Sequence, residues 1–183
     1  MDWAKTTRLF NYGENKMKQL IRQIEQWAED RNLIKGSTPQ KQMLKLMEEF
    51  GELCYGVSTN DFETVLDSIG DCLVVCTIMR KQLKMEKLFS ISHCDNANFN
   101  CGVAAQIVQA NIDLGNIANE LAKNCDVPRL EDYLSGFENQ LELITKFYKT
   151  DVHTSLIYAY RQIKDRKGKM IDGVFVKEED LCD

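Results

Sequence analysis

The sequence predicts an all-α protein, a helical bundle that ends in a short β-hairpin or an extended arm. Apolar residues recur at steps of three and four in several segments, which is the spacing of one face of an α-helix. The chain contains only 2 prolines, so long helices can run unbroken. Short connections between these segments favour helices that pack as antiparallel neighbours.

The first two helices are predicted over residues of about 14–30 and 39–57. The apolar stripe of the first comprises Met17, Leu20, Ile21, Ile24, Trp27 and Ala28. The segment 32–39 is rich in turn-forming residues and is predicted to be a loop. Thr38 can cap the second helix, with Pro39 at its first position.

The third predicted helix, at about 61–84, is the most apolar in the chain. Nearly every residue between 72 and 79 is apolar, and a helix that is apolar all round is buried on most sides. The segment 90–101 that follows is rich in Asn, Ser and Asp and is predicted to be a loop.

The second half of the chain continues the helical pattern. Two amphipathic helices are predicted at about 104–121 and 130–147, and a last helix at about 152–166. The tail 167–180 contains an Asp-Gly pair at 172–173, which is typical of a tight hairpin turn.

Length and composition indicate a folded protein with one domain. The 183 residues suit a single domain over 1–183, with a helical elaboration at about 87–150. A net charge of −5 without a basic face argues against binding to a nucleic-acid polymer. No stretch approaches the roughly 18–20 apolar residues of a membrane span. Seven cysteines without a CxxC pair lead us to expect a reducing cytoplasm and no structural disulfides.

Two acidic motifs are the most informative part of the sequence. Glu48, Glu49 and Glu52 lie within one helical turn of each other on the second predicted helix, and Asp67 and Asp71 are one turn apart on the third. If the two helices are antiparallel neighbours, the carboxylates face each other. Crowded carboxylates disfavour one another's ionised forms, and Mg²⁺ removes that penalty because it prefers hard oxygen ligands.

Structural explanations compete with a metal site at both motifs. Lys45 is one turn before Glu48 and Glu49 and could pair with either on a solvated surface. Asp71 precedes the most apolar turn of the chain, where a buried hydrogen bond could account for it. Gly70 weakens that helix, a local cost that we attribute to a site.

These residues resemble the MazG-like members of the all-α nucleoside triphosphate pyrophosphohydrolases. The family motif is EExxE, a spacer, and ExxD. Glu48, Glu49 and Glu52 match EExxE and Asp71 matches the final Asp, but Ser68 stands where the family has Glu, and Asp67 is the nearest carboxylate. The resemblance extends over residues 24–34, 42–52, 67–75, 163–170 and 173–177.

The resemblance implies a Mg²⁺-dependent enzyme, with Mn²⁺ as an alternative, that cleaves a nucleoside triphosphate into a monophosphate and pyrophosphate. Glu49, Glu52 and Asp71 are the expected metal ligands, assisted by Asp67. Glu48 is the candidate base for the attacking water, although Glu48 and Glu49 could exchange these roles. The family also implies a homodimer or homotetramer.

Basic and aromatic residues complete the expected site. Lys45, Arg166 and Lys169 are candidates to bind phosphate oxygens through charge-assisted hydrogen bonds, although basic residues followed by Gly also end helices. Three aromatic residues could flank a base, although such residues more often belong to a core. They are Trp27, Phe50 and Tyr160.

Two other functions remain open from the sequence. One is a narrower enzyme of the same superfamily, such as a dimeric dUTPase or dCTPase. The other is a non-catalytic helical interaction module, which the substitution at Ser68 keeps in consideration.

Overall fold

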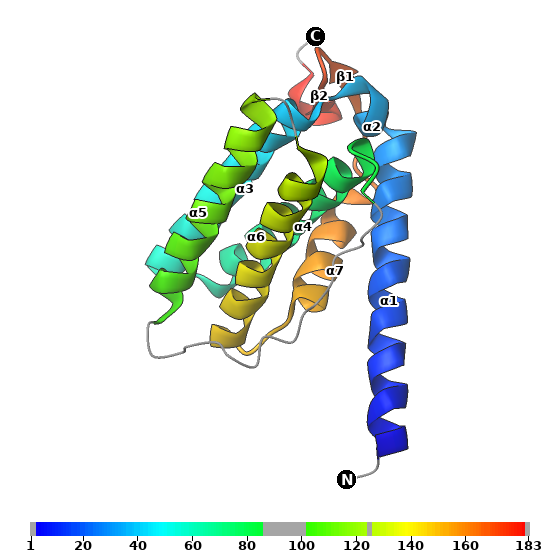
Figure 1. Cartoon of the computed structure of the whole chain (residues 1–183). Coiled ribbons are helices and arrows are strands. Elements are labelled where there is room, and N and C mark those ends of the chain that lie inside the picture. The colour runs from blue at the N-terminus through cyan, green and yellow to red at the C-terminus, as the bar shows by residue number, and fades with distance from the viewer. Residues whose placement is uncertain (1–2, 86–101, 124–125, 182–183) are drawn as a thin grey trace.

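The computed structural model describes residues 3–85, 102–123 and 126–181 and confirms the predicted all-α class. Its elements in chain order are α1 (Trp3–Asp30), α2 (Leu33–Gly36), α3 (Pro39–Thr59), α4 (Phe62–Gln82), α5 (Gly102–Ala122), α6 (Val127–Phe147), α7 (Val152–Ile163), β1 (Gly168–Ile171) and β2 (Val174–Lys177), followed by a 3₁₀ turn at Glu178–Asp180. Figure 1 shows the long α1 on one side of the bundle, α5 and α6 toward the other, and the hairpin at one end beside α2.

Side-chain caps determine where most of the helices begin. The Thr38 hydroxyl accepts a hydrogen bond from the Lys41 amide at 3.2 Å, and Pro39 occupies the first turn of α3, both as predicted. Asp61, Asp126 and Asp151 cap α4, α6 and α7 in the same way. Each cap satisfies amide groups that would otherwise lack a partner in the first helical turn.

Helix α4 forms the centre of the bundle. All its residues from Cys72 to Met79 are buried, which confirms the expectation from their apolar character. The helix packs against α1, α2, α3, α6 and α7, and the short connection at Asn60 makes α3 its antiparallel neighbour (Figure 1). The two acidic motifs therefore lie on adjacent helices.

Helices α5 and α6 pair with each other within the segment 87–150 and share the core of the bundle. The ring of Phe137 on α6 meets that of Phe50 on α3 edge-on, with centroids 5.7 Å apart. Buried residues of both helices belong to the same hydrophobic cluster as those of α1, α3, α4 and α7. Nothing is described for residues 86–101, so the loop expected at 90–101 lies outside the described residues.

The C-terminal tail forms the antiparallel hairpin that the Asp-Gly pair predicts. Gly168 pairs with Lys177 and Ile171 with Val174 across the two strands. Asp172 and Gly173 both have positive φ angles, 49° and 77°, as a two-residue turn of this kind requires.

Three boundaries differ from the predictions. Helix α1 begins at Trp3 rather than near residue 14, and α2 forms one helical turn inside the expected loop 32–39. Helix α7 ends at Ile163 rather than near residue 166, and the Arg31 side chain binds the backbone carbonyls of Lys164 and Arg166, which follow it. Within the described segments, no helix has the length and apolar character needed to cross a membrane.

Candidate functional site

A pocket of about 450 Å³ opens between α3, α4, α7 and the hairpin, with α1 and α2 at its base. This volume is within the usual range of small-molecule sites. All five carboxylates singled out in the sequence line it: Glu48, Glu49, Glu52, Asp67 and Asp71. Lys45 and Arg166 line it as well. Helical spacing on α3 and α4 thus brings together most of the predicted site residues.

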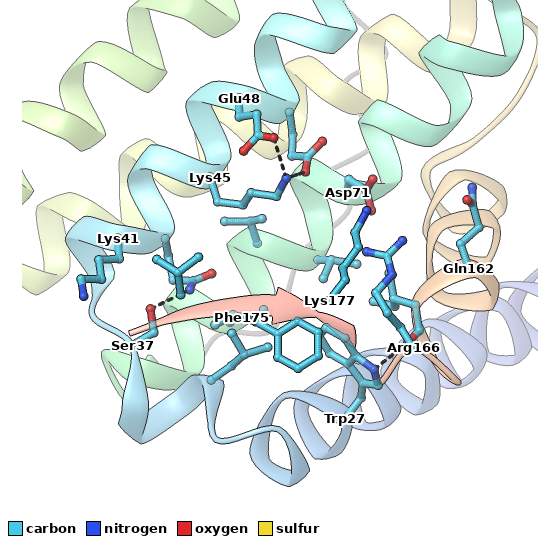
Figure 2. Close-up of a pocket in the computed structure, with 18 of the residues that line it drawn as sticks. Trp27, Ser37, Lys41, Lys45, Glu48, Asp71, Gln162, Arg166, Phe175 and Lys177 are labelled. Atoms are coloured by element: carbon cyan, nitrogen blue, oxygen red, sulfur yellow. Dashed lines mark hydrogen bonds and ion pairs between the residues drawn. The ribbon is translucent and has the colours of Figure 1, made fainter. Parts of the chain in front are cut away.

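Lys45 lies between two of these carboxylates. Its Nζ is 2.6 Å from a Glu49 oxygen and 3.1 Å from a Glu48 oxygen (Figure 2). Burial alone would lower the pKa of Lys45, but the hydrogen bonds and charges of Glu49 and Glu48 outweigh burial and raise it. The predicted pairing therefore occurs, although Glu49 is only 4% exposed and does not lie on a solvated surface.

Glu48 and Glu49 differ strongly in their surroundings. Glu48 is exposed, whereas Glu49 points into the bundle. Burial raises the pKa of Glu49, and the ion pair with Lys45 offsets only part of that rise. Glu52, one turn further along α3, is exposed and lines the same pocket.

Asp71 is the carboxylate of the pocket whose negative charge is least compensated by neighbouring groups. It makes no hydrogen bond or ion pair with any residue in the described segments, so a structural hydrogen bond does not account for it there. Burial raises its pKa from 3.8 to about 7, with further contributions from the negative charges of Glu49 and Asp67. The positive charges of Lys45 and Arg166 oppose this rise without cancelling it.

Asp67 is held by a residue that the sequence analysis did not identify. Gln162 on α7 donates a hydrogen bond from Nε2 to Asp67 Oδ1 at 2.8 Å. Burial raises the pKa of Asp67, whereas the Gln162 hydrogen bond and the charge of Arg166 lower it. Figure 2 shows Gln162 and Arg166 on the same side of the pocket as Asp71.

The chemistry of these donors fits a hard divalent cation. Carboxylate oxygens are the ligands that Mg²⁺ prefers. Asp71 is largely buried and has no partner among the residues that the structure describes, so it gains most from a nearby positive charge. In the present arrangement the described residues contain no cluster of three or more His, Cys, Asp or Glu side chains close enough to hold a metal ion. Lys45 provides the positive charge at Glu48 and Glu49 instead.

Ser68, which stands where the family has Glu, is buried and does not line the pocket. It is 2% exposed, and its hydroxyl has no hydrogen-bond partner among the described residues. Asp67, the residue before it, is the acid of this turn that lines the pocket.

Gly70 has a packing explanation rather than the site explanation expected from the sequence. A Cβ at this position would lie 2.7 Å from Ala159 Cβ and would meet the backbone carbonyl of Ser155 even more closely. The glycine therefore permits the close approach of α4 and α7, which brings Gln162 next to Asp67.

The hairpin forms one wall of the pocket and is attached to α1. The Trp27 indole donates to the Ile163 carbonyl at 2.8 Å, and its ring meets that of Phe175 at a centroid distance of 6.3 Å. Arg31 stacks 4.8 Å from the Trp27 ring and binds the Arg166 carbonyl. Trp27 lines the pocket and also belongs to the hydrophobic core, so it has both of the roles that the sequence left open.

Three other candidates lie outside the pocket. Lys169 is exposed because side chains alternate along β1, and its neighbour Met170 packs inward. Phe50 packs in the core against Phe137, and Tyr160 packs at the edge of the core. The basic residue that the hairpin does contribute is Lys177, on β2.

A buried polar pair also lines the pocket. Gln42 on α3 donates from Nε2 to Ser37 Oγ at 3.0 Å, and both side chains are buried. Lys41, beside them, contacts the backbone carbonyl of Asp172 in the hairpin turn. Gln42 lies three residues before Lys45 on α3, so helical spacing could have identified it. The positions of Ser37, Gln162 and Lys177 depend on tertiary packing, which helical spacing does not reveal.

The molecule is thus an all-α protein with an acidic pocket between two antiparallel helices and a hairpin. It is 44% identical over 151 residues to an uncharacterized 18.2 kDa protein from the rep-hol intergenic region of Haemophilus phage HP1 (strain HP1c1), in an alignment that covers 72% of this chain and 90% of the phage protein. The chain belongs to the family of that phage protein. No family model matches the sequence, and no solved structure matches it.

Proposed function

We propose that this protein is a Mg²⁺-dependent nucleoside triphosphate pyrophosphohydrolase, which converts a nucleoside triphosphate and water into a monophosphate and pyrophosphate. The observation that carries the proposal is the convergence of five carboxylates from α3 and α4 on one pocket, with Asp71 unpaired among the described residues. A pocket that crowds negative charge in this way is suited to a ligand that includes a divalent cation.

Four of the carboxylates are proposed to hold the cation. Glu49, Glu52, Asp67 and Asp71 supply hard oxygen donors, and Gln162 fixes the orientation of Asp67. When bound, Mg²⁺, or Mn²⁺ in its place, supplies positive charge that polarises the phosphate oxygens. Asp71 must be ionised to act as a ligand, and a nearby cation lowers its pKa toward that state.

Glu48 is proposed as the base. It is exposed beside the buried Glu49, so it can contact a water molecule at the opening of the pocket. The water oxygen forms a bond to the α-phosphorus, the bond from that phosphorus to the bridging oxygen breaks, and pyrophosphate leaves. The proton released by the water passes to the Glu48 carboxylate.

Basic side chains of the pocket are proposed to bind the phosphates. Arg166 and Lys177 line the pocket near Asp71, and an adjoining, more open cavity shares both residues (Figure 2). Lys45 is held by Glu48 and Glu49 and can turn to a phosphate oxygen once other positive charge compensates those carboxylates. Lys177 takes the role that the sequence analysis gave to Lys169.

The places in the fold of the five segments that resemble the MazG-like family support the same function. Each of its five segments contributes to this single pocket, through Trp27, Glu49, Asp71, Arg166 and Phe175 respectively. Segments that are far apart in the sequence therefore combine around one cavity, and the aromatic wall formed by Trp27 and Phe175 adds a surface suited to a base.

Incubation with the eight common nucleoside triphosphates and Mg²⁺ tests the proposal, with monophosphate and pyrophosphate measured as products. We expect turnover that Asp71→Asn reduces by at least about a hundredfold, since removing a transition-state stabiliser commonly has this effect. Asp113→Asn is the matched control, because burial also raises the pKa of Asp113, which lies outside the pocket on α5. Absence of pyrophosphate with every nucleotide, or full activity of Asp71→Asn, would contradict the proposal.

The same panel, extended with dUTP because dUTP is not one of the eight common nucleotides, distinguishes the alternatives. A dUTPase-like or dCTPase-like enzyme would hydrolyse one pyrimidine deoxynucleotide and leave the others intact. A non-catalytic interaction module would release no pyrophosphate. Asp67 lines the pocket, which supports the enzyme, whereas the buried Ser68 does not line it. The proposed homodimer or homotetramer is tested by light scattering of the purified protein.

A further inference from the structure

The pocket has a second polar centre, distant from its carboxylates. Ser37 and Gln42 are 7% and 6% exposed, and within the described segments the only side-chain hydrogen bond that either residue makes is the one between them, at 3.0 Å. Figure 2 shows Ser37 near Lys41, at the end of the pocket opposite to Asp71 and Arg166. A buried polar pair that lines a cavity requires an explanation, because burial of amide and hydroxyl groups is costly unless their hydrogen bonds are made.

The pair retains unused hydrogen-bonding capacity. Ser37 Oγ accepts the bond from Gln42 Nε2, so the hydroxyl proton of Ser37 can still be donated to a ligand. The Gln42 amide has one further N–H and a carbonyl oxygen. Two adjacent side chains therefore offer both donors and an acceptor to a molecule inside the pocket.

The walls around this pair are apolar and partly aromatic. Leu33, Val75 and Ile78 line the pocket together with the ring pair of Trp27 and Phe175. A flat ligand with apolar faces and a polar edge matches such a site, because its faces can contact the walls while its edge meets the polar groups. A nucleobase has this chemistry.

The spacing along α3 fits the rest of a nucleotide. Gln42, Lys45 and Glu49 follow one another at three and four residues and all line the pocket. Seven residues separate Gln42 from Glu49, which is about 10 Å along a helix axis. That is the scale of the separation between a nucleobase and its first phosphates.

We propose that the Ser37–Gln42 pair recognises the polar edge of the nucleobase and determines which nucleotides this protein prefers. This inference rests on the proposed function, since it takes the carboxylate end of the pocket as the site for the phosphates. Ser37 and Gln42 act in specificity, and the reacting atoms lie toward Asp71 at the other end.

The test measures binding of the four common nucleoside monophosphates by calorimetry, with inorganic tripolyphosphate and Mg²⁺ as a probe without a base. The wild-type protein is expected to prefer one base over another by about tenfold or more. Gln42→Met should reduce that preference to about threefold or less, and Ser37→Ala should reduce it in the same direction. Affinity for tripolyphosphate should stay within about twofold of wild type in both variants, because their base-directed hydrogen bonds do not reach it.

Gln82→Met is the matched control for Gln42→Met. Gln82 donates from Nε2 to the Leu33 carbonyl at 3.0 Å, so it also supports α2, but it does not line the pocket. We expect this control to keep the wild-type preference. Equal loss in both Met variants, parallel loss of tripolyphosphate binding, or an unchanged preference in Gln42→Met would overturn the inference.

Turnover separates this inference from the proposed reaction. Base-selective binding that depends on Gln42 without any pyrophosphate release would support the subsite and reject the reaction. Pyrophosphate release at equal kcat/KM for every base would support the reaction and reject the subsite.

Discussion

Two of the charged residues on helix α4, Asp71 and Arg80, have opposite surroundings. Nine residues apart on a helix, they point to opposite sides of α4. Arg80 is 6% exposed and binds Glu138 of α6 through two nitrogen atoms, at 2.9 and 2.8 Å. Asp71 faces the pocket and has neither a hydrogen bond nor an ion pair within the described part of the chain.

The difference separates a structural charge from a candidate functional one. Arg80 joins α4 to α6, and the Ser135 hydroxyl and Glu131 provide further contacts. Its charge is compensated inside the protein, and the pair raises the pKa of Arg80 despite burial. Asp71 instead lies near the carboxylates of Glu49 and Asp67, and the positive charges of Lys45 and Arg166 offset only part of its pKa rise, so a proton or a bound cation would complete the compensation of its charge.

The largest expected effect comes from removing the compensated charge. Arg80→Met leaves Glu138 buried without its cation, and breaking a buried pair on one side typically costs about 3–5 kcal/mol of unfolding free energy. Urea unfolding at pH 7 measures the change. Lys81→Met is the control, because Lys81 pairs with Glu25 and Glu29 nearer the surface, where we expect a loss below about 1 kcal/mol. Equal losses of unfolding free energy in the two variants would show that the buried Arg80 pair stabilises the fold no more than the surface pairs of Lys81.

Removal of the Asp71 carboxylate is expected to change the unfolding free energy in the opposite direction, toward greater stability at high pH. Because the folded-state pKa is about 7 and the ordinary value is 3.8, the folded protein retains a proton that the unfolded chain has lost between these values. Stability of the metal-free protein should therefore fall as the pH rises from about 4 to 7, by on the order of a few kcal/mol. Asp71→Asn should flatten this decline and be more stable than wild type at pH 8.

Urea unfolding in EDTA at several pH values checks this sign, with Asp113→Asn as the control that should keep most of the decline. A metal-free wild-type protein that is equally stable at pH 5 and pH 8, or an Asp71→Asn variant less stable than wild type at pH 8, would show that Asp71 is compensated.

A smaller change in stability is expected from substitution of Gly70, the residue beside Asp71. Gly70→Ala should destabilise the fold by about 1–3 kcal/mol, because the added methyl group meets Ala159 and the Ser155 backbone on α7. Gly51→Ala, on α3 with open space around its Cβ position, should stabilise the fold by about 0.5–1 kcal/mol. Thermal unfolding of both variants measures this difference, and stabilisation by Gly70→Ala would contradict the packing explanation.

The sequence predicted the helices and carboxylates well because both depend on local periodicity. Glu48, Glu49 and Glu52 are neighbours on any regular helix, and the capping residues Thr38 and Asp61 mark where helices begin. Asp71 was identified because an acid beside an apolar run is unusual, and its pKa of about 7 reflects that burial.

The remaining features depend on contacts between distant segments. Arg31 lies 135 positions before Arg166, whose carbonyl it binds, so this contact beyond the end of α7 could not be predicted from the local sequence. Gln162 reaches Asp67 only because Gly70 lets the helices approach. Lys177 rather than Lys169 lines the pocket because of the strand register, which was not predicted.

Calorimetric titration with Mg²⁺ at pH 7 tests most directly whether Asp71 is a ligand of a divalent cation. We expect wild-type protein to bind Mg²⁺ with release of protons, seen as a dependence of the heat on the buffer, because Asp71 is partly protonated at this pH. Asp71→Asn should weaken binding by at least about tenfold and abolish most of the proton release, while Asp113→Asn binds like wild type. Equal Mg²⁺ affinity in wild type and Asp71→Asn, or no binding by the wild-type protein, would contradict the account.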